Sequence, residues 1–69
     1  MIKDARDFGS SVREARRRAG LTQKELALSV GTGERFIVDL EAGKETVRLG
    51  LAFRVATSLG LYISLTDRP

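Results

Sequence analysis

Residues 20–43 read GLTQKELALSVGTGERFIVDLEAG. Thr22 is followed three positions later by Glu25, which is the signature of a capping box, so we expect a helix to begin there. Gly31 ends this helix, because glycine adopts the left-handed conformation of a helix C-terminus without steric cost. A new apolar period begins directly after that glycine, so the stretch encodes two short helices joined by a tight turn.

A helix-turn-helix unit restricts the residue type at several positions, and each can be checked here. The first helix needs a small residue where the two helices cross, and Ala27 meets that need. Gly31 lies four positions later, where the turn requires a positive φ. Ile37 is the branched aliphatic residue that the second helix must bury. The other inward positions are apolar as well: Leu26, Val30 and Leu40. We therefore predict a helix-turn-helix unit.

Further helices flank this unit on both sides. The hydrophobic periods predict helices over about 4–19, 22–30, 32–41 and 46–59. The first has Asp4 as its N-cap, and the third and fourth begin at Thr32 and Thr46. We expect the whole chain, residues 1–69, to form one all-α domain of four to five short helices.

The period changes after Gly60, where apolar and polar residues alternate over about 61–66. This alternation is typical of a half-buried β-strand. One strand has no ladder partner in its own chain, so it must pair with another copy, pair with a partner protein, or remain unpaired. We expect it to pair across a homodimer, with an interface that includes Leu61, Tyr62, Ile63, Ser64 and Leu65.

The composition limits the function. The chain contains no Cys and no His, which excludes a disulfide, a thiolate metal site and the usual catalytic Ser-His or Cys-His sets. We expect no enzymatic activity, no metal and no cofactor. No apolar run approaches the ~20 residues that span a bilayer, and no signal peptide is visible, so a soluble, cytoplasmic module is expected.

The charge is weakly basic, with 12 Lys and Arg against 9 Asp and Glu and a net charge of +3. The excess lies in residues 1–20, where Arg13 and Arg17 share a helix face. A basic small domain suggests a polyanionic partner such as nucleic acid. A solvated, arginine-rich helix face would give the same charge balance.

The run Gly20–Ala27, followed by Val30-Gly31 and Leu40–Lys44, resembles the Xre/Cro/CI family of helix-turn-helix repressors. The resemblance extends from about Val12 to Asp67. It implies a lambda-repressor-like fold and a dimeric, sequence-specific DNA-binding repressor. Such a dimer covers a pseudo-palindromic operator of double-stranded DNA and excludes the polymerase.

The segments Glu34–Ile37 and Lys44–Leu49, together with the expected strand, are similar to the HipB-like antitoxins of toxin–antitoxin operons. This narrower resemblance implies a second role, the neutralisation of a HipA-like kinase toxin. Two alternatives remain open. One is a phage-type or stand-alone repressor, and the other is a protein-interaction module that does not read DNA.

In a helix-turn-helix unit the second helix lies in the major groove. Arg35 can contact guanine O6 and N7 with two hydrogen bonds, and Glu34 and Asp39 can accept from cytosine N4. Both acids also repel phosphate, and Glu34 has an alternative role at the positive end of its own helix. The candidate base-reading residues are Thr32, Glu34, Arg35, Val38 and Asp39.

Phosphate contacts are expected at two places. Thr22 and Gln23 begin a helix whose N-terminus suits an anion, and the resemblance places a phosphate-contacting glutamine at Gln23. Lys44 and Arg48 match positions after the recognition helix that face phosphate, the alternative being solvated surface. The resemblance also pairs Arg16 with Glu41 in a structural ion pair that ties the first helix to the end of the recognition helix.

Overall fold

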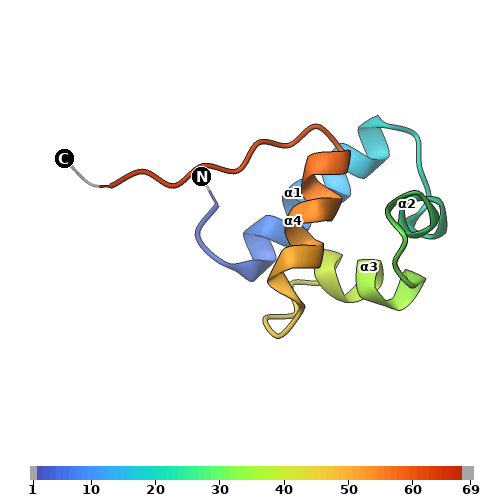
Figure 1. Ribbon diagram of the computed structural model, residues 1–69, viewed down its shortest axis with the longest axis horizontal. Helices are drawn as coiled ribbons and strands as arrows, with labels where there is room; N and C mark the ends of the chain where they lie inside the picture. The colour runs from blue at the N-terminus through green and yellow to red at the C-terminus, as the bar shows by residue number, and fades with distance from the viewer. Residues whose placement is uncertain (1, 68–69) are drawn as a thin grey trace.

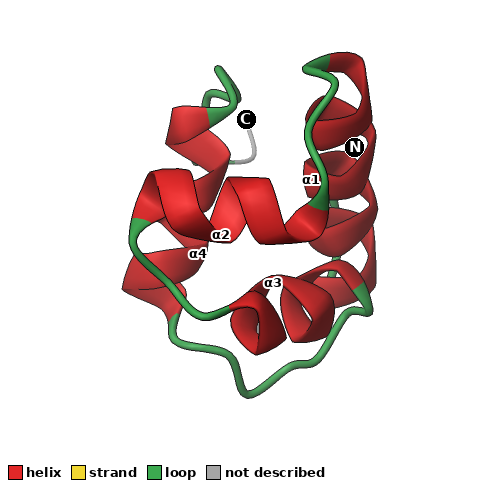
Figure 2. Cartoon of the chain, turned by 90° about the vertical axis from the view of Figure 1, so that its right-hand side faces the viewer, coloured by secondary structure: helices red, strands yellow, loops and turns green. Residues whose placement is uncertain are grey.

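The computed structural model describes residues 2–67 of the chain, and these residues form four helices (Figure 1). The helices are α1 (Ala5–Arg18), α2 (Gln23–Val30), α3 (Glu34–Glu41) and α4 (Leu49–Ser58). Helix α3 packs on α1 and α2, and α2 also packs on α4. Figure 2 shows α2 crossing the space between α1 and α4, with α3 below it. The predicted all-α class is confirmed, with four helices in the described part of the chain.

The core lies where the four helices meet. Apolar side chains from every helix contribute to one buried cluster, which consists of Val12, Leu26, Ala27, Ile37, Leu40, Ala52 and Val55. Ala27 and Ile37 are among its members, as the packing of a helix-turn-helix unit requires. No helix within residues 2–67 is long and apolar enough to cross a membrane.

The predicted capping residues of the first two helices are confirmed. The Asp4 side chain accepts a hydrogen bond from the Asp7 N–H at 2.9 Å at the start of α1. At the start of α2, Thr22 Oγ1 accepts from the Glu25 N–H at 3.0 Å, and Glu25 Oε1 accepts from the Thr22 N–H at 2.8 Å. Gly31 ends α2 with a φ of 83°, in the left-handed region.

The predicted start of the third helix is wrong. The N-cap of α3 is Gly33, which has no side chain to cap the helix, and not Thr32. The Thr32 N–H donates to the carbonyl of Ala27 at 2.9 Å. The backbone of Thr32 therefore closes the end of α2, and α3 can begin only after the turn is complete.

The predicted start of the fourth helix, at about residue 46, is also wrong. Helix α4 begins at Leu49, after Arg48 as N-cap. Residues 44–48 cross from the end of α3 to the start of α4, and Val47 packs against the core from this connector. Leu49, the first residue of α4, is left largely exposed.

The strand predicted over about 61–66 is not formed within residues 2–67. Leu61 packs against the core, and residues 62–67 run away from the helices as an extended tail, drawn in red in Figure 1. The physical reason is the one that the sequence already gives, because a strand needs a neighbouring strand and a single copy of the chain offers none.

Gly9 holds α1 and α3 in close contact. It is buried in the middle of α1, and a Cβ atom built on it would lie 2.3 Å from the carbonyl oxygen of Leu40. No real Cβ atom approaches an oxygen so closely, and the neighbour is backbone and cannot rotate away. Only glycine therefore allows this approach of the two helices.

Replacing Gly9 by alanine is expected to lower the free energy of unfolding by about 1–3 kcal/mol, because α1 and α3 must separate. Gly50 in α4 is a matched control, since its added Cβ meets nothing within 4 Å. Gly50→Ala should be neutral or stabilise by about 0.5–1 kcal/mol, through the better helix propensity of alanine. Urea unfolding of the two variants measures the difference. Equal effects would show that the helix contact tolerates the methyl group.

Candidate nucleic-acid interface

The outward side of α3 carries the residues predicted to read bases. Glu34 and Arg35 are exposed in the first turn of the helix, and Val38 is half-buried. Thr32 is also half-buried and lies in the turn before α3. The side chain of Arg35 is 84% exposed. Its guanidinium group is therefore free to reach a partner outside the protein.

Asp39 is more enclosed than the sequence suggests. Its Oδ1 lies 3.1 Å from Nε of Arg35, and its Oδ2 lies 3.6 Å from Nζ of Lys44. Only 18% of the Asp39 side chain is exposed. The structure thus makes Asp39 the ion-pair partner of two residues predicted to contact DNA, which is a different role from an acceptor for cytosine.

Glu34 lies at the start of α3, where the N-cap Gly33 offers no side-chain hydrogen bond to the helix. A carboxylate in the first turn interacts favourably with the positive end of the helix dipole. This position favours the alternative noted from the sequence, in which Glu34 stabilises its own helix.

Thr22 and Gln23 lie at the start of α2 and make hydrogen bonds within the protein. The Thr22 hydroxyl belongs to the capping box, and Gln23 Nε2 donates to Oε1 of Glu41 at 3.2 Å. An amide nitrogen carries two N–H groups. One donor of Gln23 can therefore face a phosphate while the other holds Glu41.

The connector between α3 and α4 presents two exposed cations, Lys44 and Arg48. Lys44 follows the left-handed residue Gly43, and its backbone N–H donates to the carbonyl of Asp39 at 3.0 Å. Its backbone is therefore fixed to the end of α3, while its side chain remains 54% exposed. Lys44 thus lies close to the outward side of α3.

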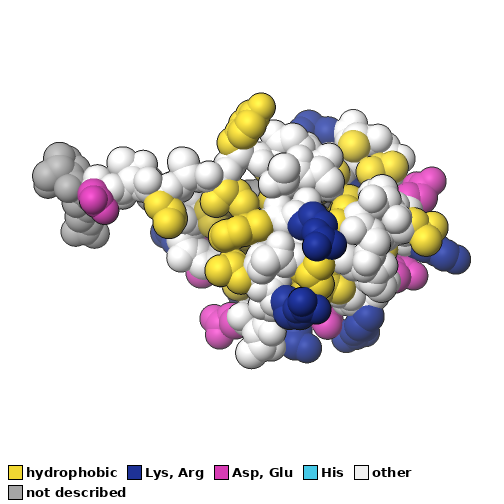
Figure 3. All heavy atoms as spheres, in the orientation of Figure 1, with side chains coloured by type: hydrophobic (Ala, Val, Ile, Leu, Met, Phe, Trp, Pro, Cys, Tyr) yellow, Lys and Arg dark blue, Asp and Glu magenta, His cyan; other side chains and the backbone are white. Residues whose placement is uncertain are grey.

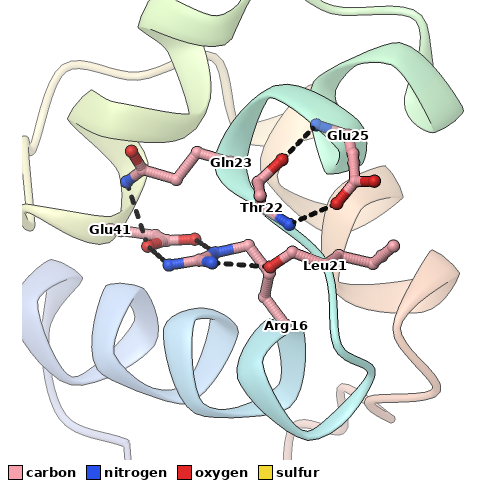
Figure 4. A network of polar contacts seen from close by, with 6 residues as sticks. All are labelled: Arg16, Leu21, Thr22, Gln23, Glu25 and Glu41. Carbon is pink, nitrogen blue, oxygen red and sulfur yellow. Dashed lines mark hydrogen bonds and ion pairs between the residues drawn. The ribbon is translucent and has the colours of Figure 1, made fainter.

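Arg16 and Glu41, predicted as a structural pair, are brought together in the interior between α1 and α3 (Figure 4). Arg16 Nε donates to Glu41 Oε2 at 2.7 Å, and Nη2 donates to Oε1 at 3.0 Å. Arg16 Nη1 also donates to the carbonyl of Leu21 at 2.8 Å. With Gln23 on the same carboxylate, this network joins α1, the start of α2 and the end of α3.

The network also fixes the charge of Arg16. Hydrogen bonding to Glu41 raises the pKa of Arg16, with a further contribution from the charge of Glu41, and together they outweigh the opposing effect of burial. Because its pKa is raised, Arg16 contributes the stability that comes from its own charge fully below the ordinary range of arginine. This contribution of Arg16 is lost as the pH rises through the raised value, in strong alkali.

Arg13 and Arg17 were not among the candidate site residues, although the sequence placed both on one basic helix face that suggests a polyanionic partner. They lie on one face of α1 and line a shallow concavity with Gln23 and Val38, residues of α2 and α3 that were expected to contact DNA. The i, i+4 spacing of the two arginines was the available signal. Their distance from α3 could not be read from spacing alone.

The predicted dimer residues lie in the extended tail. Tyr62 and Leu65 are almost fully exposed, and Ser64 is also exposed. Figure 3 shows apolar side chains gathered where the tail leaves the helices. An open apolar groove is formed there by Phe53, Thr57, Leu61, Tyr62, Ile63 and Leu65.

Comparison with known proteins places the chain in a family. Residues 12–65 match the HTH_3 family, described as helix-turn-helix. The HTH-type transcriptional regulator y4mF of Sinorhizobium fredii is 47% identical over 64 residues, covering 93% of this chain and 84% of its own. A further HTH-type transcriptional regulator, from Methanothermobacter thermautotrophicus, is 47% identical over 49 residues, which is 71% of each chain.

Several similar solved structures are chains of HipB complexes. A chain of the HipB-O4 20mer complex superposes with a TM-score of 0.86 at 26% sequence identity, covering 100% of this chain and 97% of that chain. A chain of the HipA-HipB-O2-O3 complex gives the same score and identity, with the same coverage. The chain therefore belongs to the Xre-type helix-turn-helix (HTH_3) family, whose members are DNA-binding transcriptional regulators and not enzymes.

Proposed function

We propose that this chain is a dimeric, sequence-specific repressor that covers a pseudo-palindromic operator and so excludes the polymerase. The observation that carries this proposal is the outward side of α3, where an exposed arginine stands on a helix that the Arg16–Glu41 network fixes to the rest of the domain. A rigid helix with an exposed fork of donors suits the major groove. A repressor must reach its operator on the DNA, so the expected cytoplasmic location is part of this proposal.

In this proposal the α3 side reads bases and its surroundings hold phosphates. Arg35 is the main base-reading residue, with Thr32, Val38 and Glu34 beside it. Phosphates are bound on both sides of α3. The proposed phosphate contacts are Thr22, Gln23, Lys44 and Arg48. Arg13 and Arg17 are further candidates, because they line the same concavity as Gln23.

Dimerisation is proposed to occur through the tail. Leu61, Ile63 and Leu65 present apolar side chains, and the backbone of residues 62–67 lies in an exposed segment. Pairing with the same segment of a second copy satisfies the backbone and buries the side chains together. A two-fold axis makes that pairing antiparallel. Operator half-sites should then lie about one helical turn, ~34–36 Å, apart.

The finer proposal is that the chain is also the antitoxin of a HipA-like kinase. It is supported by the likeness to HipB chains, one of them in a complex with HipA. Relatives at 47% identity are named only as transcriptional regulators, so a stand-alone repressor remains the alternative. Co-expression with the product of the adjacent gene tests this. A stable complex that tightens operator binding supports the antitoxin, and a separate migration of the two proteins supports the alternative.

A protein-interaction module that does not read DNA was the candidate from another class, based on the acids of the recognition helix. The ion pairs of Asp39 weaken that case, because this acid is balanced by Arg35 and Lys44. The outward side of α3 is therefore less acidic than the sequence suggests.

The experiment that tests DNA reading begins with selection of a duplex from a random library by the wild-type chain. Arg35→Ala should then weaken binding by about 1–3 kcal/mol and relax the preference at one base pair. Lys44→Ala should instead weaken all sequences alike and lower the slope of log affinity against log salt by about 1. Fluorescence anisotropy at several salt concentrations measures both effects. Unchanged affinity and preference in Arg35→Ala would remove this residue from the reading set.

A further inference from the structure

Asp39 carries a negative charge on the helix that faces DNA, where it should repel phosphate. It is the acid of α3 whose carboxylate lies between two cations that the proposed function assigns to DNA. The two carboxylate oxygens are divided between them, with Oδ1 beside Arg35 and Oδ2 beside Lys44. The arrangement therefore connects the base-reading residue to a phosphate-binding residue.

Asp39 contacts the Nε end of the Arg35 guanidinium group. Asp39 faces Nε of Arg35 at 3.1 Å. A guanidinium group has five N–H donors in a fixed plane, so an acid beside Nε does not occupy the edge formed by the two Nη atoms. Bidentate recognition of guanine O6 and N7 requires such a pair of parallel donors.

Helix stability does not account for an acid at this position. Asp39 lies in the last turn of α3, where the helix dipole disfavours a negative charge. An ion pair with a side chain as exposed as that of Arg35 adds little to the stability of the fold. The residue is better explained by what it does to the two cations.

We propose that Asp39 is a positioning residue for specificity, which holds Arg35 ready for guanine and lowers the attraction of Lys44 for phosphate in general. This inference rests on the proposed function, in which Arg35 reads a base. It assigns Asp39 no base of its own. Loss of its carboxylate should therefore reduce discrimination between sequences and leave binding to unrelated DNA unchanged or stronger.

The test compares wild type, Asp39→Asn, Arg35→Ala and the double variant, all as the full chain. Each is titrated by fluorescence anisotropy against the duplex selected by wild type, all its single-base-pair variants and an unrelated duplex. We expect Asp39→Asn to lose about 5-fold or more of the discrimination at the base pair that Arg35→Ala identifies. Its affinity for the unrelated duplex should be unchanged or higher, and in the Arg35→Ala background it should cause no further loss of discrimination.

Glu14→Gln is the matched control, because it removes one negative charge from an exposed position on α1. It should leave discrimination unchanged, and all variants should melt within about 4 °C of wild type, as surface substitutions do. Full discrimination in Asp39→Asn would overturn the inference. So would a loss that persists in the Arg35→Ala background, since Asp39 would then read a base itself. A wild-type chain that selects no sequence would instead overturn the proposed repressor function, and this inference with it.

Discussion

Replacing Arg16 by alanine is expected to lower the free energy of unfolding by about 3–5 kcal/mol, because it leaves the buried carboxylate of Glu41 without its partner. The Glu41 side chain is only 3% exposed, so in the intact protein its carboxylate depends on these hydrogen bonds and not on water. For a domain of this size the loss is a large share of the whole stability. Glu41→Ala should lower the free energy of unfolding by a similar amount, since it leaves the buried Arg16 guanidinium without its carboxylate partner. Urea unfolding followed by circular dichroism measures both variants.

Two controls separate this effect from the loss of any surface cation. Arg17→Ala and Arg18→Ala, at exposed positions beside Arg16, should change the stability by less than about 0.5 kcal/mol. The double variant Arg16→Met/Glu41→Leu removes both charges together and should be far more stable than either single alanine variant. If all three arginines gave equal, small effects, Arg16 would be one more solvated cation.

Ending the chain after Leu61 is expected to convert the proposed dimer into a monomer and to weaken operator binding by about 10²- to 10⁴-fold, because the second half-site is no longer held nearby. Leu61 is retained in this variant because it packs against the core. The fold itself should therefore survive, as circular dichroism can verify. Sedimentation equilibrium gives the oligomeric state and anisotropy gives the affinity for the selected duplex.

Two further variants locate the effect within the tail. Ile63→Pro removes one backbone N–H and should also abolish the dimer if that N–H belongs to a ladder. Ending the chain after Leu65 keeps the proposed interface and should leave the dimer intact. A shortened chain that still sediments as a dimer would assign the interface to the apolar surface of α4, where Leu49 and Phe53 are exposed.

Features that depend on local sequence could be predicted well. The capping box of Thr22 and Glu25 and the left-handed Gly31 are dictated by neighbours only a few residues away. The burial of Ala27 and Ile37 follows from the fixed geometry of two helices joined by a short turn. In each case the sequence spacing alone determines which atoms meet.

Features that depend on a distant part of the chain could not be predicted from spacing. Thr32 is a good N-cap by type, yet its backbone is used by the end of α2. Position 9 requires glycine because α3, some thirty residues later in the sequence, passes close to it. The strand prediction was wrong for one copy of the chain. An alternating pattern indicates which face is apolar, but a strand also needs a neighbouring strand, which a single copy does not supply.

The network around Glu41 has a thermodynamic consequence for association with DNA. Because one carboxylate receives hydrogen bonds from both Arg16 on α1 and Gln23 on α2, the orientation of α3 is already set in the free protein. The domain then needs no folding step when it binds, so little conformational entropy is lost in α2 and α3. The heat-capacity change that α2 and α3 contribute on binding should therefore reflect only the area that they bury against DNA. It should be less negative than the change that accompanies coupled folding.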